Sequence, residues 1–569
     1  MTKEMYTGAE ILLKSLVEEG IKEIFGYPGG VILTVYEALY NQNDIKHYLV
    51  RHEQAAVHAA EGYARITGRP GVALVTSGPG ACNTVTGIAN AYYDGYPIVV
   101  FTGQVGLSQI GNDAFQEADI VGITRSCCKH NYLVKDVKDL QRIIKEAFHI
   151  ASTGKPGPVV VDLPKDILVQ KTVFDYPKTV KLAGYSPNYK GHPIQISRAL
   201  KMLAEAHRPA VISGGGVLTS GAYNELLKIA ELIKIPVAHT LMGTGTFPSD
   251  SPLDLGMLGM HGNFWANHAI SHADVIFALG TRFNDRITGC LKRFARDAHV
   301  IHVDIDPCSI SKNVKADIPI VGDVKNVLCG MISEFEKTNP EIYKEDKEKW
   351  LKQIEEWKQK RVPFNNPLSG KLSAITAIQK LYEMTKQYNP IVCTEVGQHQ
   401  MWTAQLFKFN KPGKFITSGG LGTMGFGFPA AMGACAAKPE QLVLNIAGDG
   451  SIQMNIQELA TCVDYGFKVI NCVIDNGYLG MVRQWQEKLY DKHYSESKIS
   501  HPDFVKLAES YGATGIKVEH EDEIEPAVKK ALEAKTPVII DFVTEPLEMV
   551  YPWVLAGEPL TKVLLSNEC

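Results

Sequence analysis

Two polar residues of this chain, Asp449 and Asn476, have the types and surroundings needed to hold a metal ion beside a phosphate. Asp449 stands between two glycines directly after the apolar run 442–446, and Asn476 follows a second apolar run, 468–474. If both runs are strands of an open α/β sheet, both residues lie at its carboxyl edge, where ligands collect. Magnesium, held by a few protein oxygens together with phosphate oxygens, is the expected ion. The glycines on either side of Asp449 would let the backbone approach a phosphate closely.

The same residues have a simpler interpretation. Gly-Asp-Gly fits a tight turn, and an asparagine that follows a strand is a typical turn residue. On Gly-Asp-Gly alone, the turn is the favoured interpretation. The place of Asn476 at the end of a second strand shifts the balance towards a diphosphate–magnesium site.

Alternating strands and helices must position these residues. The chain begins with a helix after Thr7, which forms a capping box with Glu10, and Gly20 suits its C-terminal cap. Short β-branched runs then alternate with helical stretches, which is typical of parallel sheets buried on both faces. The expected strands are 72–75, 98–101, 159–161, 209–213, 273–279, 300–303, 391–393, 442–446, 468–474 and 538–542. We therefore expect an α/β fold of three doubly wound parallel-sheet domains.

Shifts in composition give the domain boundaries. The charged stretch 344–361 ends near Pro363 and has few apolar positions, which predicts a solvated connector. The last twenty residues are weakly periodic and contain proline, which predicts a mobile arm. The expected organisation is an N-terminal domain over 1–175, a central domain over 190–335, a connector over 336–371, a third domain over 372–550 and a C-terminal arm over 551–569.

Composition excludes several classes of protein. Of 569 residues, 45% are hydrophobic and 21% are charged, which is typical of a globular protein. A net charge of −4 provides no basic field for nucleic acid or anionic lipid. No apolar run is long enough to span a membrane, and the first residues lack the pattern of a signal peptide. The 11 cysteines include no CxxC pair and fit reduced thiols, so we expect a cytoplasmic enzyme.

Further motifs occur in order along almost the whole chain. They are YPGG at 27–30, RHEQAA at 51–56, TSGPG at 76–80, AFQE at 114–117, RFNDR at 282–286, GLGTMGFG at 420–427, GDGSIQMNIQELAT at 448–461 and DNGYLGMVRQWQ at 475–486. Gly-Asp-Gly followed after about 25 residues by asparagine is the signature of thiamine-diphosphate enzymes, and the full set resembles their acetohydroxyacid synthase (acetolactate synthase, large subunit) family. One such motif would be weak evidence, whereas the ordered set is strong.

The resemblance implies a pyrimidine-binding domain, a central FAD-binding domain and a diphosphate-binding domain. By this resemblance, Mg²⁺ would be held by Asp449, Asn476 and the carbonyl of Tyr478. Thiamine diphosphate would be bound by Pro28, Gly29, Glu53, Val396, Gly397, Gln398, His399, Gly422, Met424, Gly450, Ser451, Leu479, Gly480, Met481 and Val482.

Two of these residues would act on the thiamine ring. Glu53 would hydrogen-bond the pyrimidine nitrogen and drive the imino tautomer that deprotonates the thiazolium carbon. Alternatively, Glu53 could simply be a glutamate in the first turn of a helix, where its charge interacts favourably with the helix dipole, because the sequence 55–64 is plainly helical. Met424 would hold the thiamine in its bent form, although a methionine at this position could equally belong to the core.

Four more residues would select or admit the substrates. Arg286 offers a planar fork for the carboxylate of a 2-keto acid, and Trp485 matches the residue associated with accepting 2-ketobutyrate. Gln116 and Lys165 resemble members of the access channel. The alternatives are surface ion pairs for the basic residues and a core position for the tryptophan.

The resemblance places FAD in the central domain, where it would be largely structural because the net reaction transfers no electrons. Its expected contacts are Lys155, Gly214, Gly215, Gly216, His261, Gly262, Arg282, Asp304, Asp306 and Asp323. Lys155 replaces the family's usual arginine, which keeps the charge and loses the two-pronged geometry. The pair His268 and His272 could share a helix face, but no carboxylate accompanies it, so we expect a surface position.

The implied activity is that of a transferase at the first common step of valine, leucine and isoleucine biosynthesis. Pyruvate would be decarboxylated on thiamine diphosphate, and the hydroxyethyl carbanion would add to pyruvate or 2-ketobutyrate to give 2-acetolactate or 2-aceto-2-hydroxybutyrate. The alternatives are a flavin-linked pyruvate oxidase, another thiamine-dependent decarboxylase or carboligase, and a binding module without chemistry. Catabolic acetolactate synthases lack the FAD stretches and RFNDR.

The resemblance also implies partners. Active sites would lie at the interface of a homodimer, or within a homotetramer built from such dimers. No segment like an added regulatory domain follows the third block, so valine regulation would require a separate small subunit. No nucleic-acid or membrane partner is expected.

Overall fold

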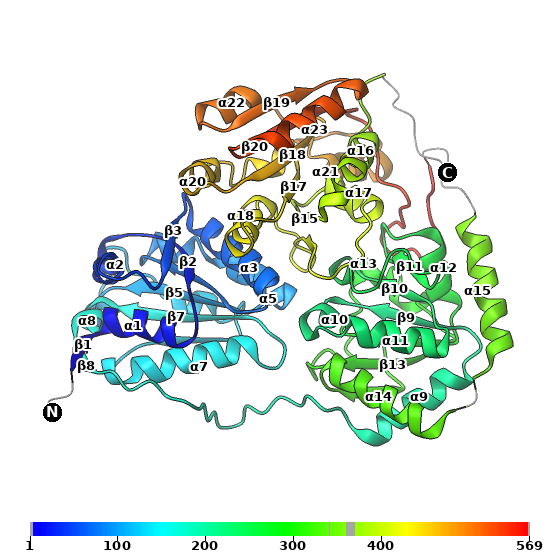
Figure 1. Ribbon diagram of the computed structural model, residues 1–569, viewed down its shortest axis with the longest axis horizontal. Coiled ribbons are helices and arrows are strands. Elements are labelled where there is room, and N and C mark those ends of the chain that lie inside the picture. The colour runs from blue at the N-terminus through cyan, green and yellow to red at the C-terminus, as the bar shows by residue number, and fades with distance from the viewer. Residues whose placement is uncertain (1–3, 341, 360–369, 567–569) are drawn as a thin grey trace. The chain divides into compact units, whose positions relative to one another are not determined.

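The computed structural model describes residues 4–340, 342–359 and 370–566 of the chain. The described residues form two compact units: one contains 4–185, 384–399 and 416–544, and the other contains 186–340, 342–359, 370–383, 400–415 and 545–566. Three six-stranded parallel sheets with helices on their faces confirm the predicted α/β class (Figure 1). No helix in the described ranges is both long and apolar enough to cross a membrane.

The N-terminal sheet lies in the first unit and has the strand order β3-β2-β4-β5-β7-β6. Its strands β4, β5 and β7 are buried along their whole length, as expected where helices cover both faces. The strands are β2 (Glu23–Tyr27), β3 (Lys46–Leu49), β4 (Gly71–Val75), β5 (Ile98–Gln104), β6 (His130–Leu133) and β7 (Pro158–Pro164). The main helices are α1 (Gly8–Glu18), α2 (Leu33–Tyr40), α3 (Glu53–Thr67), α5 (Val85–Asp94), α7 (Leu140–Ser152) and α8 (Lys165–Val169).

The start of the chain follows its sequence signals closely. Thr7 caps α1, with its hydroxyl accepting from the Glu10 backbone N–H while the Glu10 carboxylate accepts from the Thr7 N–H. Gly20 follows the last turn with a φ of 73°, a conformation that favours glycine. The predicted capping box and terminal glycine are confirmed. Strand β1 (Met5–Thr7), just before α1, pairs with β8 (Lys171–Val173) antiparallel to it.

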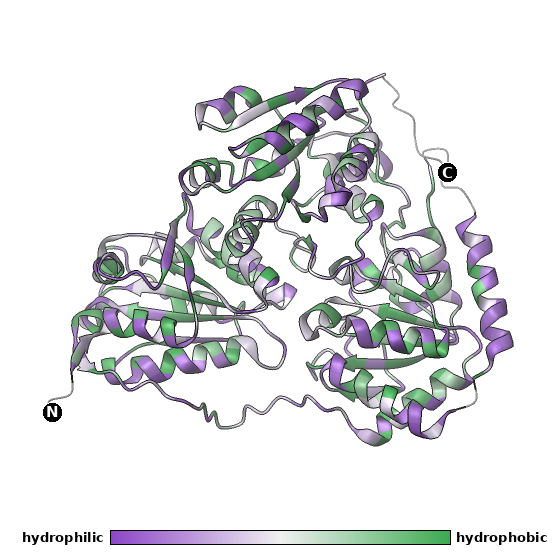
Figure 2. Ribbon diagram, viewed as in Figure 1, coloured by the Kyte–Doolittle hydropathy of each residue, from purple (hydrophilic) through white to green (hydrophobic). Residues whose placement is uncertain are grey.

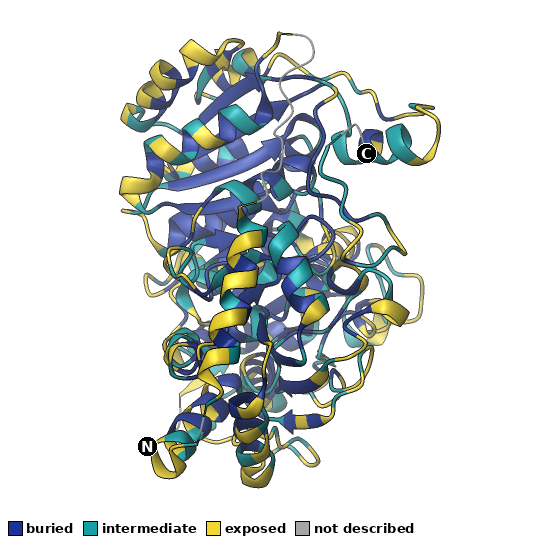
Figure 3. Ribbon diagram, turned by 90° about the vertical axis from the view of Figure 1, so that its right-hand side faces the viewer, coloured by how far each residue is buried: buried dark blue, intermediate teal, exposed yellow. Residues whose placement is uncertain are grey.

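The C-terminal sheet, almost all of it in the same unit, has the order β16-β15-β17-β18-β20-β19. Most strand residues of the sheets are buried, as the dark blue arrows of Figure 3 show. The strands are β15 (Ile391–Thr394), β16 (Phe415–Ile416), β17 (Val443–Gly448), β18 (Val469–Asp475), β19 (Thr514–Val518) and β20 (Val538–Val543). The helices include α16 (Ala374–Thr385), α17 (Gln398–Leu406), α18 (Gly427–Ala437), α19 (Asp449–Ile452), α20 (Glu458–Tyr465), α21 (Gly480–Leu489), α22 (Phe504–Ser510) and α23 (Ile524–Glu533).

Helix α3 of the N-terminal domain packs directly against α18 of the C-terminal domain. A Cβ added at Gly62 would lie 2.1 Å from the Ala430 carbonyl oxygen, and one added at Gly433 would lie 1.9 Å from that of Ala59. Glycine is therefore required on both helices for the backbones to approach this closely. The residues around the contact form one hydrophobic core that the two domains share.

The second unit contains the central sheet, with the order β11-β10-β9-β12-β13-β14. The strands are β9 (Pro209–Ser213), β10 (Val237–His239), β11 (Asp254–Met257), β12 (Val275–Leu279), β13 (His299–Asp304) and β14 (Ile318–Val321). The helices include α9 (Pro193–Glu205), α10 (Gly215–Ser220), α11 (Tyr223–Ile233), α12 (Phe264–His272), α13 (Asp285–Thr288) and α14 (Val324–Thr338).

The charged stretch expected to be a solvated connector is partly a packed helix, α15 (Lys344–Lys358). Most of α15 is hydrophilic (Figure 2), but Lys347, Trp350 and Ile354 are buried. The Lys347 ammonium donates to the carbonyls of Leu203 and Ala204 at 3.0 and 2.9 Å, near the end of α9. One face of α15 is therefore bound to the second unit. Pro363 and the segment around it lie outside the described residues.

The predicted mobility of the C-terminal arm is a second expectation that the structure corrects. Trp553 and Val554 are almost fully buried in the second unit. The Val554 N–H donates to the Met260 carbonyl at 2.8 Å, and Trp553 pairs with Leu564 in an antiparallel bridge. Apolar side chains at these positions hold the described part of the arm in place, although the arm lacks helical periodicity.

The α3–α18 contact predicts a strong effect of Gly433→Ala. The new methyl would overlap backbone atoms of α3, so we expect the free energy of unfolding to fall by about 1–3 kcal/mol or more. Urea unfolding checks this as a lower transition midpoint. The matched control is Gly106→Ala, whose Cβ would find its nearest neighbour at 3.5 Å. Equal midpoints for the two variants would contradict the packing argument.

Candidate functional site

The structure brings Asp449 and Asn476 together at the carboxyl edge of the C-terminal sheet. Asp449 follows β17 and begins α19, and Asn476 follows the neighbouring strand β18. The Gly477 N–H donates to Asp449 Oδ2 at 3.1 Å and so joins the two loops. Both side chains are buried. The sequence pattern therefore leads to the juxtaposition that a shared ligand requires.

Buried amides fix the orientation of Asn476. Its Oδ1 accepts from the Tyr478 N–H at 3.0 Å, and its Nδ2 donates to Gln398 Oε1 at 3.2 Å. Gln398 in turn donates from Nε2 to Gln484 Oε1 at 2.8 Å. This chain of amides links the loop after β18 to the first residue of α17 and to α21.

Two further residues complete a cluster of possible metal ligands. Oxygen and nitrogen atoms of Asp449, Asp475 and His501 all lie within 4.8 Å of one another. His501 Nε2 lies 3.0 Å from Asp475 Oδ1. Residues 477–479 are hydrogen-bonded to 497–499, which brings His501 near the cluster. Asp475 has a sequence signal, since it directly precedes Asn476, whereas the long loop before His501 gives none.

The electrostatics of this cluster fit a divalent cation. Burial, and after it the charge of Asp475, raises the pKa of Asp449 to about 7. Burial and the same neighbour also raise the pKa of Asp541 to about 7. Crowded, poorly solvated carboxylates are stabilised in their charged form by a nearby cation. The donor set is dominated by oxygen, which suits Mg²⁺.

The predicted diphosphate residues lie around the same edge. A Cβ added at Gly450 would lie 2.9 Å from the Leu479 side chain and 4.0 Å from the Met424 methyl carbon. A Cβ at Gly480 would overlap Gln398 Oε1 at 2.1 Å. These glycines border the side chains of the site, and a larger residue would have to displace them. His399 lies beside Gly448, and the Ser451 hydroxyl accepts from the Gly448 N–H. The Val396 side chain lies 4.0 Å from a Cβ added at Gly422. Gly397, Met481 and Val482 flank these residues in sequence.

A second group of predicted residues gathers at the N-terminal sheet. Glu53 is buried at the start of α3, and its carboxylate accepts from Asn83 Nδ2 at 2.8 Å. A Cβ at Gly80 would lie 3.1 Å from Glu53 Oε1 and 2.7 Å from Thr76. Thr76 also borders Gly29, which follows Pro28, and the Gln116 carbonyl lies against Gly78. In the described part of the chain, the hydrogen bonds of Glu53 join it to this N-terminal group and not to the group around Asp449.

The predicted substrate residues lie at several separate places. Lys165 is exposed at the start of α8, and Trp485 is partly buried in α21 beside Gln484. Arg286 lies in the second unit with an exposed side chain, and its Nη1 contacts the Met260 sulfur at 3.3 Å. Their substrate roles stay predictions.

Most of the predicted FAD residues follow strands of the central sheet. Gly214 follows β9, Asp304 ends β13 and Asp323 follows β14, so all three lie at the carboxyl edge, where ligands bind in open sheets. Asp304 accepts from the Asp306 N–H at 2.9 Å, and Asp323 caps α14. His261 is buried and stacks on Trp553, and Gly262 and Arg282 lie in the loops that follow β11 and β12. Lys155 belongs to the first unit, with its ammonium over the Tyr92 ring.

The glycine run 214–216 has a packing reason of its own. A Cβ at Gly214 would lie 2.2 Å from the Gly280 carbonyl oxygen, and one at Gly216 would lie 2.6 Å from the Gly280 Cα. Two strand-to-helix turns thus meet backbone to backbone. The rings of His268 and His272 stack on one another and lie beside Trp357. His272 is exposed, as expected, whereas His268 is partly buried.

Comparisons with known proteins agree with this arrangement. Three family models match in order: the N-terminal TPP binding domain of thiamine pyrophosphate enzymes over residues 6–123, the central domain over 196–331 and the C-terminal TPP binding domain over 395–542. The chain is 48% identical over 570 residues to the acetolactate synthase isozyme 3 large subunit of Escherichia coli, covering 99% of both chains. It is 49% identical over 566 residues to a probable acetolactate synthase large subunit of Methanocaldococcus jannaschii, covering 98% of this chain and 95% of the relative. The chain therefore belongs to the acetolactate synthase large-subunit family of thiamine pyrophosphate enzymes.

Proposed function

We propose that this chain is the catalytic subunit of an acetolactate synthase. It decarboxylates pyruvate and joins the remaining two-carbon unit to a second 2-keto acid, either pyruvate or 2-ketobutyrate. The observation that carries the proposal is the convergence of Asp449, Asn476 and Gln398 at the carboxyl edge of the C-terminal sheet. Full-length similarity to acetolactate synthase large subunits supports the choice of reaction.

The C-terminal group holds the cofactor's charged end. Asp449, Asn476 and the Tyr478 carbonyl are the proposed Mg²⁺ ligands, with Asp475 and His501 beside them. Gly450 and Gly480 border the side chains of Leu479 and Gln398 at this edge, beside which the diphosphate would lie. Thiamine diphosphate, when bound, supplies a carbon nucleophile and an electron sink for decarboxylation. The buried amides keep Asn476 turned towards its partners.

Glu53 and Met424 act at the reactive end. The Glu53 carboxyl holds a proton at the pyrimidine nitrogen, and its contact with Asn83 keeps the group in one orientation. Met424 would contact the bound cofactor from the side of Gly450.

Each active site is completed by a second copy of the chain. Among the described residues, no hydrogen bond joins the group around Glu53 to the group around Asp449, which is compatible with a site shared across a homodimer. Gln116 and Lys165 line the substrate approach, Arg286 binds the carboxylate of the second keto acid, and Trp485 accommodates 2-ketobutyrate. An arginine fork is the best match for such a carboxylate.

FAD occupies the carboxyl edge of the central sheet and has a structural role. Asp304, Asp306 and Asp323 provide acceptors for its hydroxyl groups, and Gly214–Gly216 form the turn beside it. Regulation by valine requires a separate small subunit, in keeping with the "large subunit" names of the relatives.

Thiamine-dependent acetolactate formation is the direct test of the proposal. The purified chain is incubated with pyruvate, with and without thiamine diphosphate, Mg²⁺ and FAD, and acetolactate is measured colorimetrically. We expect product only with all three cofactors, and competition when 2-ketobutyrate is added. Uptake of oxygen or reduction of a quinone with pyruvate, without acetolactate, would instead indicate a pyruvate oxidase.

Glu53→Gln is expected to keep the fold and lose at least about 100-fold in kcat, because the amide cannot exchange the proton at the ring. The measurements are acetolactate formation and the affinity for thiamine diphosphate, which should change little. Glu37→Gln, at an exposed position of α2, is the matched control. Near-normal turnover by Glu53→Gln would remove the assigned role.

Asp449→Asn is expected to weaken Mg²⁺-dependent binding of thiamine diphosphate at least about tenfold, because the cation loses a charged ligand. Tryptophan fluorescence during cofactor titration at fixed Mg²⁺ measures this directly. Asp464→Asn removes an exposed aspartate that pairs with Arg51 and should leave binding unchanged. Equal affinities for the two variants would contradict the metal assignment.

A further inference from the structure

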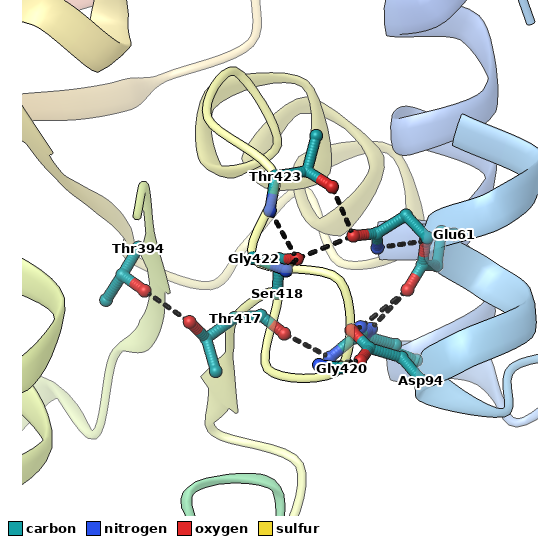
Figure 4. Close-up of polar contacts among 10 residues, drawn as sticks. Glu61, Asp94, Thr394, Thr417, Ser418, Gly420, Gly422 and Thr423 are labelled. Atoms are coloured by element: carbon teal, nitrogen blue, oxygen red, sulfur yellow. Dashed lines mark hydrogen bonds and ion pairs between the residues drawn. The ribbon is translucent and has the colours of Figure 1, made fainter. Parts of the chain in front are cut away.

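The loop that carries Met424 is held by side chains from the N-terminal domain. Residues 417–425 lie before α18. Three buried polar side chains of α3 and α5 bond to this loop, and a fourth, that of Glu61, bonds to two of the three (Figure 4). Helix α3 provides Glu61 and Arg65, and α5 provides Asn90 and Asp94. None of these four residues belongs to the groups described above.

Arg65 is the centre of this arrangement. Its side chain is only 4% exposed, and its Nη2 pairs with Asp94 Oδ2 at 2.6 Å and with the Glu61 carboxylate. Its remaining terminal nitrogen, Nη1, donates to the Thr417 carbonyl oxygen at 2.9 Å. The guanidinium plane also lies over the ring of Tyr96. One cation thus joins both helices to the first residue of the loop.

Asn90 and Asp94 bind the rest of the loop. Asn90 Oδ1 accepts from the hydroxyls of Ser418 and Thr423 at 2.6 and 2.9 Å, while its Nδ2 donates to Glu61 at 2.9 Å. Asp94 Oδ1 accepts from the Gly420 N–H at 2.6 Å. The Ser418 hydroxyl in turn accepts from the N–H groups of Gly422 and Thr423.

The far end of the loop is attached to the C-terminal domain. The buried Glu395 carboxylate accepts from the Gly425 N–H at 2.6 Å, and Asn455 donates to the Gly425 carbonyl at 2.7 Å. Met424 therefore lies between two sets of fixed hydrogen bonds. Gly422 and Gly425 have φ angles of 76° and 88°, so the loop backbone has little preference of its own and its shape must be imposed from outside.

Stability alone gives little reason for such a cluster. Two carboxylates and one guanidinium are fully or almost fully desolvated, and well-packed apolar residues often replace buried ion pairs at no cost in stability. A buried polar cluster instead restricts its side chains to one arrangement, because each charge must keep its partners. Here every partner outside the cluster belongs to the loop, apart from the aromatic rings.

We propose that Arg65, Asp94 and Asn90 are positioning residues for Met424: they act through the loop 417–425 and set where this side chain lies beside Gly450. The role of Met424 at the cofactor rests on the proposed function, whereas the attachment of the loop does not. The same helix α3 begins with Glu53, so in the proposed homodimer this helix places Glu53 for one site and, through the loop, Met424 for the other.

The first test is amide hydrogen exchange on the full chain without added cofactor. Thr423→Val removes one hydroxyl from the cluster and keeps the shape of the side chain, and Asn90→Ala removes all three hydrogen bonds of Asn90. We expect exchange in residues 418–425 to become at least about tenfold faster, corresponding to the loss of about one hydrogen bond, with no change in α1. Thr124→Val removes a buried hydroxyl that bonds to Ile120 and is the matched control. Unchanged exchange in 418–425 would overturn the proposal.

The second test is a double-mutant cycle with Met424→Ala, read in kcat and in thiamine diphosphate affinity. Because misplacement by about 1 Å can cost about 100-fold, we expect Thr423→Val or Asp94→Asn to lower kcat about 10-fold in the native background. In the Met424→Ala background, the same changes should cost less than about twofold, since residues acting through one another are not additive. Equal losses in both backgrounds would indicate a general structural role and overturn the proposal. If the parent chain forms no acetolactate, the proposed function fails, and hydrogen exchange still decides whether the cluster positions the loop.

Discussion

The contact between helices α3 and α18 is the constraint on which the rest of the first unit depends. At Gly62 and Gly433 the two backbones approach so closely that no side chain fits between them. This contact merges the N-terminal and C-terminal sheets into one hydrophobic core and leaves α3 little freedom to shift. Because α3 cannot slide along its axis, the positions of its first residue, Glu53, and of Arg65, about three turns later, are both fixed.

The polar cluster around Arg65 uses this rigidity. A buried guanidinium tolerates few arrangements, because each desolvated charge must meet an opposite charge or a carbonyl oxygen. With α3 fixed by its glycine contact, the directions of the Arg65, Asn90 and Asp94 side chains are fixed as well. The flexible glycine-rich loop must then adopt the one conformation that satisfies them. Apolar packing thus determines the position of α3, and the hydrogen bonds of its polar cluster determine the conformation of the loop.

Local sequence patterns predicted much of the fold because they report on burial and period. The ten expected strands all occur, with ends that differ by a few residues, and Asp449 and Asn476 lie at adjacent strand ends as predicted. Long-range polar partnerships have no such local signal. Arg65 and the Thr417 carbonyl are separated by 352 positions, and His501 reaches Asp475 only because 497–499 pairs with 477–479. The predictions of a solvated α15 and a mobile C-terminal arm are wrong for a related reason. A few buried residues, such as Trp350 and Trp553, hold segments whose average composition is polar or irregular.

Glycine is needed in this chain for two different physical reasons, and the sequence alone does not distinguish them. Gly214 and Gly216 face the backbone of Gly280, and Gly433 faces that of Ala59, so these positions are explained by close approach of main chains. Gly450 and Gly480 instead face the side chains of Leu479 and Gln398, at the edge where Asp449 and Asn476 meet. In the first group, glycine is required by folding whether or not a ligand binds. In the second, a larger residue would displace the very side chains that border the proposed diphosphate. A glycine-rich motif is therefore evidence for a ligand site only once its neighbours are known to be functional side chains rather than backbone.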